Sequence, residues 1–402
     1  MAPSVFERVE LAPRDPILGL NEAFAADPRQ RKVNLGVGVY YDEGGKIPLL
    51  RAVREAERAL AESPTPRGYL PIEGIAAYDA AVQQLLFGAD SPVLMSGRLV
   101  TAQALGGTGA LKIGADFLKR ILPDALVLIS DPSWENHRAL FETAGFAVST
   151  YPYYDSAKRG LDFGGMKAAL AAAEPGSIVV LHACCHNPTG VDLDRAQWAD
   201  VVRIAADRRL VPFLDIAYQG FGEGIDADAA AVRLFAEAGM PFFIASSFSK
   251  SFSLYGERVG ALTIVTEDME QAARVLSQVK RTIRTNYSNP PTHGGAVVAA
   301  VLADRKLRAM WEDELGAMRE RIKSLRQQLV DGLNRHGARG DFSFILRQRG
   351  MFSYTGLTAQ QVERLREQFG IYAVSSGRIC VAALNANNLE YVCASVAAVL
   401  KN

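Results

Sequence analysis

The sequence lacks a long hydrophobic run. Its longest apolar segments, such as residues 294–303 and 178–181, are far shorter than the roughly 18 to 20 residues of a membrane-spanning helix. The first ten residues include Glu7, Arg8 and Glu10, where a secretory signal peptide has its apolar core. We therefore expect a protein that neither crosses a membrane nor is secreted.

Cysteine is scarce, with 4 residues among 402. Cys184 and Cys185 are adjacent, which is poor geometry for a disulfide bond, and no C-x-x-C spacing occurs. We interpret all the cysteines as small buried residues of a reduced, cytoplasmic protein. The histidines show no spacing typical of metal ligands, apart from the pair His182 and His186, so we expect no metal.

Neither sign of charge is in excess, because 44 Lys and Arg residues balance 44 Asp and Glu residues. This balance provides no overall attraction to nucleic acid or to an anionic membrane, so neither partner is predicted. The hydrophobic share of 49% and the charged share of 22% are ordinary for a globular protein and exclude a disordered chain. The length of 402 residues suffices for two or three domains of about 150 residues each.

Helical and strand-like segments alternate along most of the chain, which is typical of an α/β fold. Short apolar runs are interpreted as buried parallel strands at residues 125–129, 177–181, 211–214, 242–245 and 259–265. Each of the first four runs leads directly into polar residues. Because ligands bind at the carboxyl ends of strands in open α/β sheets, these polar ends predict one shared site.

The pattern changes after about residue 315. Residues 314–334 predict a long helix, and shorter helix and strand patterns follow it. This part indicates a smaller α+β domain, with which the segment 15–47 is expected to pack. The predicted organisation is an N-terminal arm at 1–14, a small domain at 15–47 and 316–402, and a large domain at 48–315.

Lys250 follows one of the buried-strand patterns and lies among small and aromatic residues. A cation is costly to bury in such surroundings, so the pKa of this lysine is expected to be lowered. A neutral amine is what Schiff-base chemistry requires. From the local sequence alone, a surface lysine in a loop is the alternative.

Asp215 ends the strand pattern at 211–214, and Tyr218 lies three residues further on. A buried aspartate can keep the ring nitrogen of pyridoxal phosphate protonated, which makes the ring an electron sink. The alternative is that Asp215 caps the next turn of the chain. Tyr218 is close enough in sequence to face the same site.

The segment Gly-Gly-Thr-Gly at 106–109 opens a predicted helix. Its free backbone N–H groups and the positive end of the helix dipole suit a phosphate, although such turns before helices are common. The segment lacks the G-x-G-x-x-G spacing after a strand that would indicate a nicotinamide nucleotide.

Two arginines lie next to apolar strand patterns. Arg258 comes eight residues after Lys250, and Arg378 directly precedes the apolar run 379–383. An arginine is costly to bury unless it meets an anion, and the natural anion is a carboxylate held by two parallel hydrogen bonds. A structural salt bridge is the alternative.

Together these segments resemble the class I, fold-type I aminotransferases. The lysine signature of that family is similar to S-x-S-K at 247–250 followed by G-E-R-V-G at 256–260. Three further family motifs resemble H-N-P-T-G at 186–190, D-x-A-Y-Q-G-F at 215–221 and S-G-R at 376–378. Because the motifs occur together and in order across nearly the whole chain, the resemblance is highly specific.

Within that family the chain is similar to the aspartate and aromatic branch. The segments 131–137, 249–258 and 349–354 look closer to bacterial aromatic (tyrosine) aminotransferases, and aspartate enzymes more often have asparagine where Gly256 stands. The resemblance implies a large coenzyme-binding domain, with a mostly parallel seven-stranded sheet between helices, and a smaller α+β domain. It also implies a homodimer with shared active sites.

The implied reaction is a ping-pong transfer of the amino group from tyrosine or phenylalanine, and also from aspartate or glutamate, to 2-oxoglutarate. Pyridoxal 5'-phosphate is the implied coenzyme, and amino acids and 2-oxo acids are the implied partners. An aspartate aminotransferase with little aromatic activity is the alternative. The sequence leaves the preferred amino acid open.

The resemblance implies catalytic roles for Lys250, which would bind the coenzyme covalently and transfer the proton, and for Asp215 and Tyr218. The residues implied to bind the coenzyme are Tyr69 of the neighbouring subunit, Gly107, Thr108, Trp134, His137, Asn187, Asp215, Tyr218, Ser247, Ser249, Lys250 and Arg258. Those implied to contact the substrate are Gly38, Trp134, Asn187, Arg284 and Arg378.

The two substrate arginines have different implied roles. Arg378 would bind the α-carboxylate of every substrate, whereas Arg284 would reach across the dimer to the distal carboxylate of aspartate or glutamate. An aromatic ring would not tolerate Arg284 beside it, and aromatic members of the branch let this arginine swing aside. We therefore expect both substrate classes to be used.

Overall fold

The computed structural model describes residues 4–12, 15, 17–66 and 68–401. The predicted N-terminal arm is thus described only at residues 4–12. Pro16 and Asn402 of the predicted small domain, and Arg67 of the large one, also lie outside the described residues.

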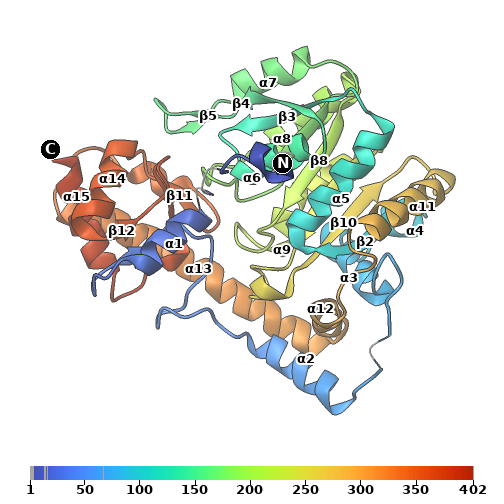
Figure 1. The fold of residues 1–402 in the computed structure, drawn as a ribbon, viewed down its shortest axis with the longest axis horizontal. Helices are drawn as coiled ribbons and strands as arrows, with labels where there is room; N and C mark the ends of the chain where they lie inside the picture. The colour runs from blue at the N-terminus through green and yellow to red at the C-terminus, as the bar shows by residue number, and fades with distance from the viewer. Residues whose placement is uncertain (1–3, 13–14, 16, 67, 402) are drawn as a thin grey trace.

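A mostly parallel seven-stranded sheet forms the centre of the molecule (Figure 1), which confirms the predicted α/β fold. The strands follow the order β2-β10-β9-β8-β7-β3-β4. They are β2 (Leu99–Leu105), β3 (Leu126–Asp131), β4 (Ala147–Pro152), β7 (Ile178–His182), β8 (Val211–Ile216), β9 (Phe242–Ser247) and β10 (Val259–Val265).

The orientation of β10 differs from the prediction. This strand is antiparallel to both of its neighbours, β2 and β9, so the interpretation of residues 259–265 as a parallel strand is wrong. The connection from β9 to β10 spans only residues 248–258 and includes no more than the short 3-10 helix η2 (Tyr255–Glu257). A parallel connection needs a crossover of about a dozen residues or more, usually with an α-helix, so the short loop returns the chain antiparallel.

Helices cover both faces of the sheet (Figure 1), as a buried parallel sheet requires. Alternate side chains of a strand point to opposite faces, so Val127 and Ile129 belong to one core and Leu128 to the other. The helices of the first core are α5 (Gly106–Ile121), α6 (Glu135–Thr143) and α11 (Met269–Asn286). Those of the second include α3 (Ala76–Phe87), α7 (Phe163–Ala172), α8 (Arg195–Asp207), α10 (Ala230–Glu237) and α12 (His293–Ala303).

The other elements lie at the edges of this sheet or in the C-terminal region. They are η1 (Val5–Arg8), α1 (Leu18–Ala26), β1 (Val33–Asn34), α2 (Arg51–Glu62), α4 (Pro92–Met95), β5 (Tyr154–Asp155), β6 (Gly160–Leu161), α9 (Ile225–Asp228), α13 (Arg305–Arg335), η3 (Ser343–Arg347), β11 (Phe352–Tyr354), α14 (Ala359–Phe369), β12 (Ile371–Tyr372), β13 (Arg378–Cys380), η4 (Val381–Ala383) and α15 (Leu389–Leu400).

Helix α13 is longer than the predicted helix at 314–334. It has 31 residues and begins at Arg305, because the side chain of Asp304 accepts hydrogen bonds from the backbone N–H groups of Lys306 and Leu307. The helix runs from the sheet to the C-terminal region (Figure 1), and the expected domain boundary near residue 315 falls inside it. The division into two domains stays a prediction.

The N-terminal segment packs with the C-terminal region, as expected for residues 15–47. Strand β1 pairs in parallel with β12, with Val33 opposite Ile371. Residues that lie more than 300 positions apart in the sequence thus share one small sheet.

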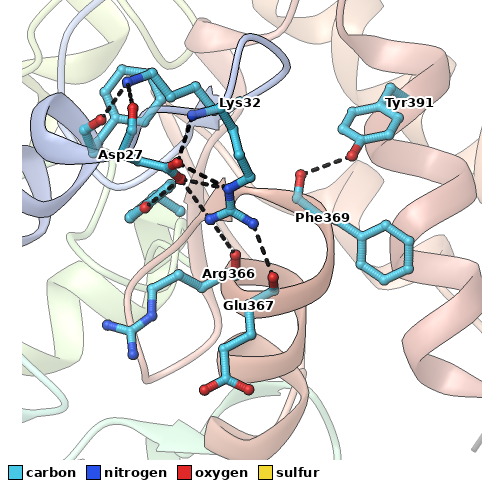
Figure 2. A network of polar contacts seen from close by, with 9 residues as sticks. Asp27, Lys32, Arg366, Glu367, Phe369 and Tyr391 are labelled. Atoms are coloured by element: carbon cyan, nitrogen blue, oxygen red, sulfur yellow. Dashed lines mark hydrogen bonds and ion pairs between the residues drawn. The ribbon is translucent and has the colours of Figure 1, made fainter.

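Polar contacts reinforce this packing (Figure 2). Lys32 Nζ donates to the carbonyl of Asp27 at 2.6 Å, where α1 ends, which is the favourable place for a cation on a helix. Arg29 donates to the carbonyls of Arg366 and Glu367 near the end of α14, at 3.0 and 2.9 Å. Its guanidinium also pairs with the carboxylate of Asp27 and holds the pKa of that group below its usual value. The N-terminal segment is therefore bound to α14 by charge-assisted hydrogen bonds.

Cys184, Cys185, Cys380 and Cys393 are free and buried, which confirms their interpretation as small core residues. Among the described residues, none of the helices has both the length and the apolar character that crossing a bilayer demands.

Candidate active site

A cavity of about 230 Å³ lies beyond the carboxyl ends of β3, β7, β8 and β9. The polar strand ends that the sequence predicts to share a site thus meet at one place, as the geometry of α/β sheets requires. The predicted site residues that line this cavity are Gly38, Gly107, Thr108, Trp134, Asn187, Asp215, Tyr218, Ser247, Ser249, Lys250, Arg258 and Arg378.

Three of the predicted residues do not line the cavity. His137 lies behind Asp215 and bonds to it. Tyr69 is 96% exposed, and Arg284 is exposed near the end of α11, where it contacts the hydroxyl of Ser288. These are the two side chains expected to serve a neighbouring subunit, so their outward position agrees with that expectation.

The sequence interpretation missed part of the lining. The missed residues are Ile17, Leu111, His182, Ala217, Tyr255 and Phe352. Tyr255 and Phe352 lie inside the segments that carry the family resemblance, but an aromatic residue in such a segment does not reveal by itself that it faces a cavity. His182 is the last residue of β7, and the rule that polar strand ends face the site could have found it.

Asp215 provides a buried negative charge at the end of β8. Its side chain is 6% exposed, and its Oδ2 lies 2.9 Å from Nε2 of His137, whose Nδ1 is 2.9 Å from the hydroxyl of Ser133. Burial alone would raise the pKa of Asp215, but the hydrogen bond from His137 and the nearby His182 and Lys250 leave that pKa below its usual value. Asp215 is therefore a carboxylate at neutral pH.

Three buried donors, His137, His182 and Asp215, lie within 4.8 Å of one another, which is close enough for a metal site. His137 and Asp215 already bond to each other, and the rings of His137 and His182 lie 4.9 Å apart. Burial lowers the pKa of His182 to about 3, so this ring is neutral. The cluster thus forms a neutral wall that supports the charge of Asp215.

Lys250 is the amine of the cavity. Its Nζ lies 4.8 Å from the centre of the Tyr218 ring. Burial lowers the pKa of Lys250 to about 8, and Arg258 lowers it further while Asp215 opposes the shift. A substantial fraction of the amine is therefore neutral, and nucleophilic, near physiological pH.

This lowered pKa predicts a pH dependence of stability while the amine is unmodified. Between pH 8 and about 10.4, the unfolded chain binds a proton at Lys250 that the folded chain has released. The free energy of unfolding should therefore rise with pH across this window, by up to about 3 kcal/mol from this group. Urea unfolding at pH 7.5, 9 and 10.5 measures the rise. A Lys250→Met variant should lack it, and parallel profiles for the two proteins would contradict the assignment.

The first turn of α5 and Arg258 form a positively charged end of the cavity. Helix α5 has no acidic residue in its first turn, so its N–H groups are available to an anion. Arg258 adopts a left-handed backbone (φ +54°), and its Nη1 donates to the Ser249 hydroxyl at 3.3 Å and to the Tyr255 carbonyl at 2.9 Å. A Cβ at Gly106 would lie 2.4 Å from Nη2 of Arg258, so only glycine lets the guanidinium lie over the helix end. This donor set suits a phosphate.

Arg378 forms the opposite positively charged end. It is only 1% exposed, and it donates to Oδ1 of Asn187 at 3.0 Å and to the carbonyl of Gly36 at 2.6 Å. Its Nε is buried without a partner, and Arg378 forms no ion pair with any residue that the structure describes. A buried guanidinium with a spare donor fits a carboxylate ligand.

Gly38 allows an aromatic ring to lie beside Arg378. A Cβ at Gly38 would come 2.7 Å from Cζ of Phe352, which is too close for any other residue. The ring of Phe352 in turn lies 4.3 Å from Cζ of Arg378 and packs edge-on against Tyr218. The apolar wall and the carboxylate-binding end of the cavity are thus one packed unit.

A larger groove, of about 930 Å³, lies among α3, α4 and α10. Its lining mixes Arg98 and Arg233 with Asp226 and Glu237, and no group in it is strongly buried and unpaired. Convergence of buried polar groups marks a ligand site better than volume does, so the smaller cavity is the candidate active site.

Comparison with known proteins gives consistent relationships. The family model for aminotransferases of class I and II matches residues 30–396. The chain is 67% identical to a Pseudomonas aeruginosa protein named aspartate aminotransferase, over 99% of this chain and all of that protein. It is 54% identical to the aromatic-amino-acid aminotransferase of Escherichia coli, over 98% of this chain and all of that protein. A crystal structure of an aromatic-amino-acid aminotransferase from Burkholderia pseudomallei, covalently bound to pyridoxal phosphate, superimposes with a TM-score of 0.97 at 71% identity, covering 99% of this chain and 100% of that one.

Proposed function

Because this chain belongs to the class I and II aminotransferase family, we propose that it transfers amino groups from both aromatic and dicarboxylic amino acids to 2-oxoglutarate. Relatives named for aspartate and for aromatic amino acids support this dual use. The observation that carries the proposal is one cavity that holds an amine of lowered pKa, a buried carboxylate and an unpaired buried guanidinium: Lys250, Asp215 and Arg378.

Pyridoxal 5'-phosphate is the coenzyme, and when bound it supplies an electron sink for the bond that breaks at the substrate Cα. The cavity fits this group, because a phosphate suits the start of α5 with Arg258, and a protonated ring nitrogen suits the carboxylate of Asp215. We assign the remaining coenzyme contacts to Gly107, Thr108, Trp134, Asn187, Tyr218, Ser247 and Ser249.

The chain's own groups divide the work of the reaction. Arg378 holds the α-carboxylate of each substrate, using its unpaired Nε. Lys250 holds the coenzyme until the substrate amine displaces it, and then its free amine takes the proton from Cα. His137 keeps Asp215 oriented and charged throughout. The first 2-oxo acid leaves before the second one binds, which makes the reaction ping-pong.

We propose that two copies of the chain form a homodimer with shared sites. The exposure of Tyr69 and Arg284, and their absence from the cavity of their own chain, support a role for both at the neighbouring site. Tyr69 would bind the coenzyme phosphate there, and Arg284 would bind the distal carboxylate of a dicarboxylic substrate. We also propose a cytoplasmic location, because the cysteines are free and buried.

Replacing Arg284 with alanine should separate the two substrate classes. We expect kcat/KM for aspartate to fall roughly 100-fold, since two charge-assisted hydrogen bonds to the distal carboxylate are lost. The value for phenylalanine should change less than about 3-fold, because its ring makes no use of that charge. Steady-state kinetics with each amino acid and 2-oxoglutarate measure both values.

Arg281→Ala is the matched control, because Arg281 is an exposed arginine on the same helix, one turn earlier. It should leave both substrates unaffected. An equal loss on aspartate and phenylalanine in Arg284→Ala would contradict the dual use of the site. A wild-type enzyme with little activity on phenylalanine would instead favour the alternative, an aspartate aminotransferase.

A further inference from the structure

Arg326, in the second half of α13, is a buried arginine that the reaction described above does not use. Its side chain is only 3% exposed. Nη2 donates to the backbone carbonyls of Gly350 at 2.5 Å and Phe352 at 2.8 Å, and Nε is buried without a partner. Within the described part of the chain it forms no ion pair, so two peptide carbonyls are its recorded acceptors.

Such a buried cation is costly. Burial lowers the pKa of Arg326 to about 10, so the group still carries its charge at neutral pH. Arg321, on the same helix, also donates to backbone carbonyls, but it is more exposed and pairs with Glu43. The difference suggests that the segment Arg326 binds, rather than the helix, explains its burial.

The segment 349–352 lies between three elements of the site. The N–H of Arg349 donates to the carbonyl of Gly190 in the N-P-T-G turn, at 2.7 Å. Strand β11 pairs antiparallel with β13, which places Tyr354 opposite Arg378. Arg326 binds the same segment from the third side, through α13.

The Phe352 ring transmits this anchoring to the cavity. It lines the cavity, lies 4.3 Å from Cζ of Arg378 and fills the space that Gly38 leaves open. Fixing the carbonyl of Phe352 fixes the position of its Cα, and thereby the ring that lies against the guanidinium of Arg378. A shift of the backbone by a fraction of an ångström would change that contact directly.

We propose that Arg326 is a positioning residue for the substrate carboxylate: it holds the backbone of residues 350–352 so that Phe352 braces the guanidinium of Arg378. The inference rests on the proposed function, in which Arg378 binds the α-carboxylate. It assigns substrate binding to a charged side chain that contacts neither the substrate nor the coenzyme. A merely structural Arg326 would affect stability alone.

The test compares Arg326→Met and Arg326→Lys with the wild-type holoenzyme. In Arg326→Met we expect KM for both phenylalanine and aspartate to rise about 10-fold, with kcat changed less than about 3-fold, because a displaced Arg378 weakens binding of every α-carboxylate. Arg326→Lys should fall between, since an ammonium group keeps the charge but loses the planar fork of donors. The dissociation constant of 3-phenylpropionate, an unreactive carboxylic acid, should rise by the same factor in an absorbance titration.

Arg208→Met is the matched control. Arg208 also donates two hydrogen bonds to a backbone carbonyl, that of Ala173, but it lies outside the cavity lining. It should leave KM and the 3-phenylpropionate affinity unchanged. If Arg326→Met lowers only the melting temperature, as a structural contact would, the inference is overturned.

An Arg378→Met variant separates this inference from the proposed function. If it fails to weaken binding of 3-phenylpropionate, the carboxylate role of Arg378 is wrong. If it weakens binding while Arg326→Met does not, only the present inference is wrong. Should Arg326→Met fail to fold, a double-mutant cycle of Arg326→Lys with Phe352→Leu decides: coupled effects on KM support the positioning role, and additive effects contradict it.

Discussion

Replacing Lys250 with alanine is expected to reduce kcat by at least about 10⁴-fold, since the variant loses both the covalent anchor of the coenzyme and the base that moves the Cα proton. No other lysine lines the cavity among the described residues. The neighbouring Arg258 cannot replace it, because a guanidinium stays protonated at any working pH. Single-turnover and steady-state rates with phenylalanine and aspartate measure the loss.

The absorbance spectrum of the purified protein gives an independent measurement. The wild-type enzyme should show a Schiff-base band that shifts with pH and disappears when an amino acid is added, and Lys250→Ala should show neither change. Lys250→Arg should be equally inactive, although it retains a positive charge, because a guanidinium neither forms an imine nor accepts a proton. Lys167→Ala, at an exposed lysine that pairs with Asp200, is the control. Turnover of Lys250→Ala near the wild-type rate would show that the proposed chemistry is wrong.

The sequence located the cavity because the physics of the sheet is local in that region. Each buried strand is a short apolar run, and each run ends where a polar residue must meet either water or a ligand, as at Asp215 and Lys250. The motifs that resemble those of the family lie on these strand ends. Their order along the chain was therefore enough to predict which side chains meet.

The orientation of β10 and the start of α13 were not predictable from apolar runs alone. A buried strand has the same composition whether it is parallel or antiparallel, and only the length of the connection at 248–258 excludes a parallel crossover. The start of α13 depends on a single cap, Asp304, while the apolar pattern of the helix continues from both sides of residue 314.

Arg326 shows a deeper limit of prediction from sequence. It lies on a helix with many charged residues, and nothing in its neighbours distinguishes it from Arg319 or Arg321. Its burial arises when the segment 350–352, more than 20 residues away, packs over it. Tyr69 and Arg284 show the complementary limit, because a role at a neighbouring site cannot be derived from the packing of one chain.

The second large effect is expected at Asp215, whose replacement by asparagine keeps the size of the side chain and removes its charge. We expect kcat to fall about 10²- to 10³-fold, the usual effect of removing a preorganised electrostatic partner. The coenzyme would lose the carboxylate that favours a protonated ring nitrogen, and with it most of its capacity as an electron sink. KM should change much less, because Arg378, at the other end of the cavity, still binds the carboxylate.

The pH profile sharpens this prediction. The pKa of Asp215 lies below its usual value, so the carboxylate is charged at every pH above about 4, and the activity should show no inflection from this group between pH 5 and 9. Asp228→Asn is the matched control: this second buried aspartate accepts hydrogen bonds from the N–H groups of Gly220, Gly222 and Glu223 and lies outside the cavity lining. It should lower the melting temperature and leave kcat within about 10-fold. An Asp215→Asn variant that loses affinity for its substrates but keeps kcat would contradict the electrostatic role, because it would place Asp215 in binding rather than in the chemical step.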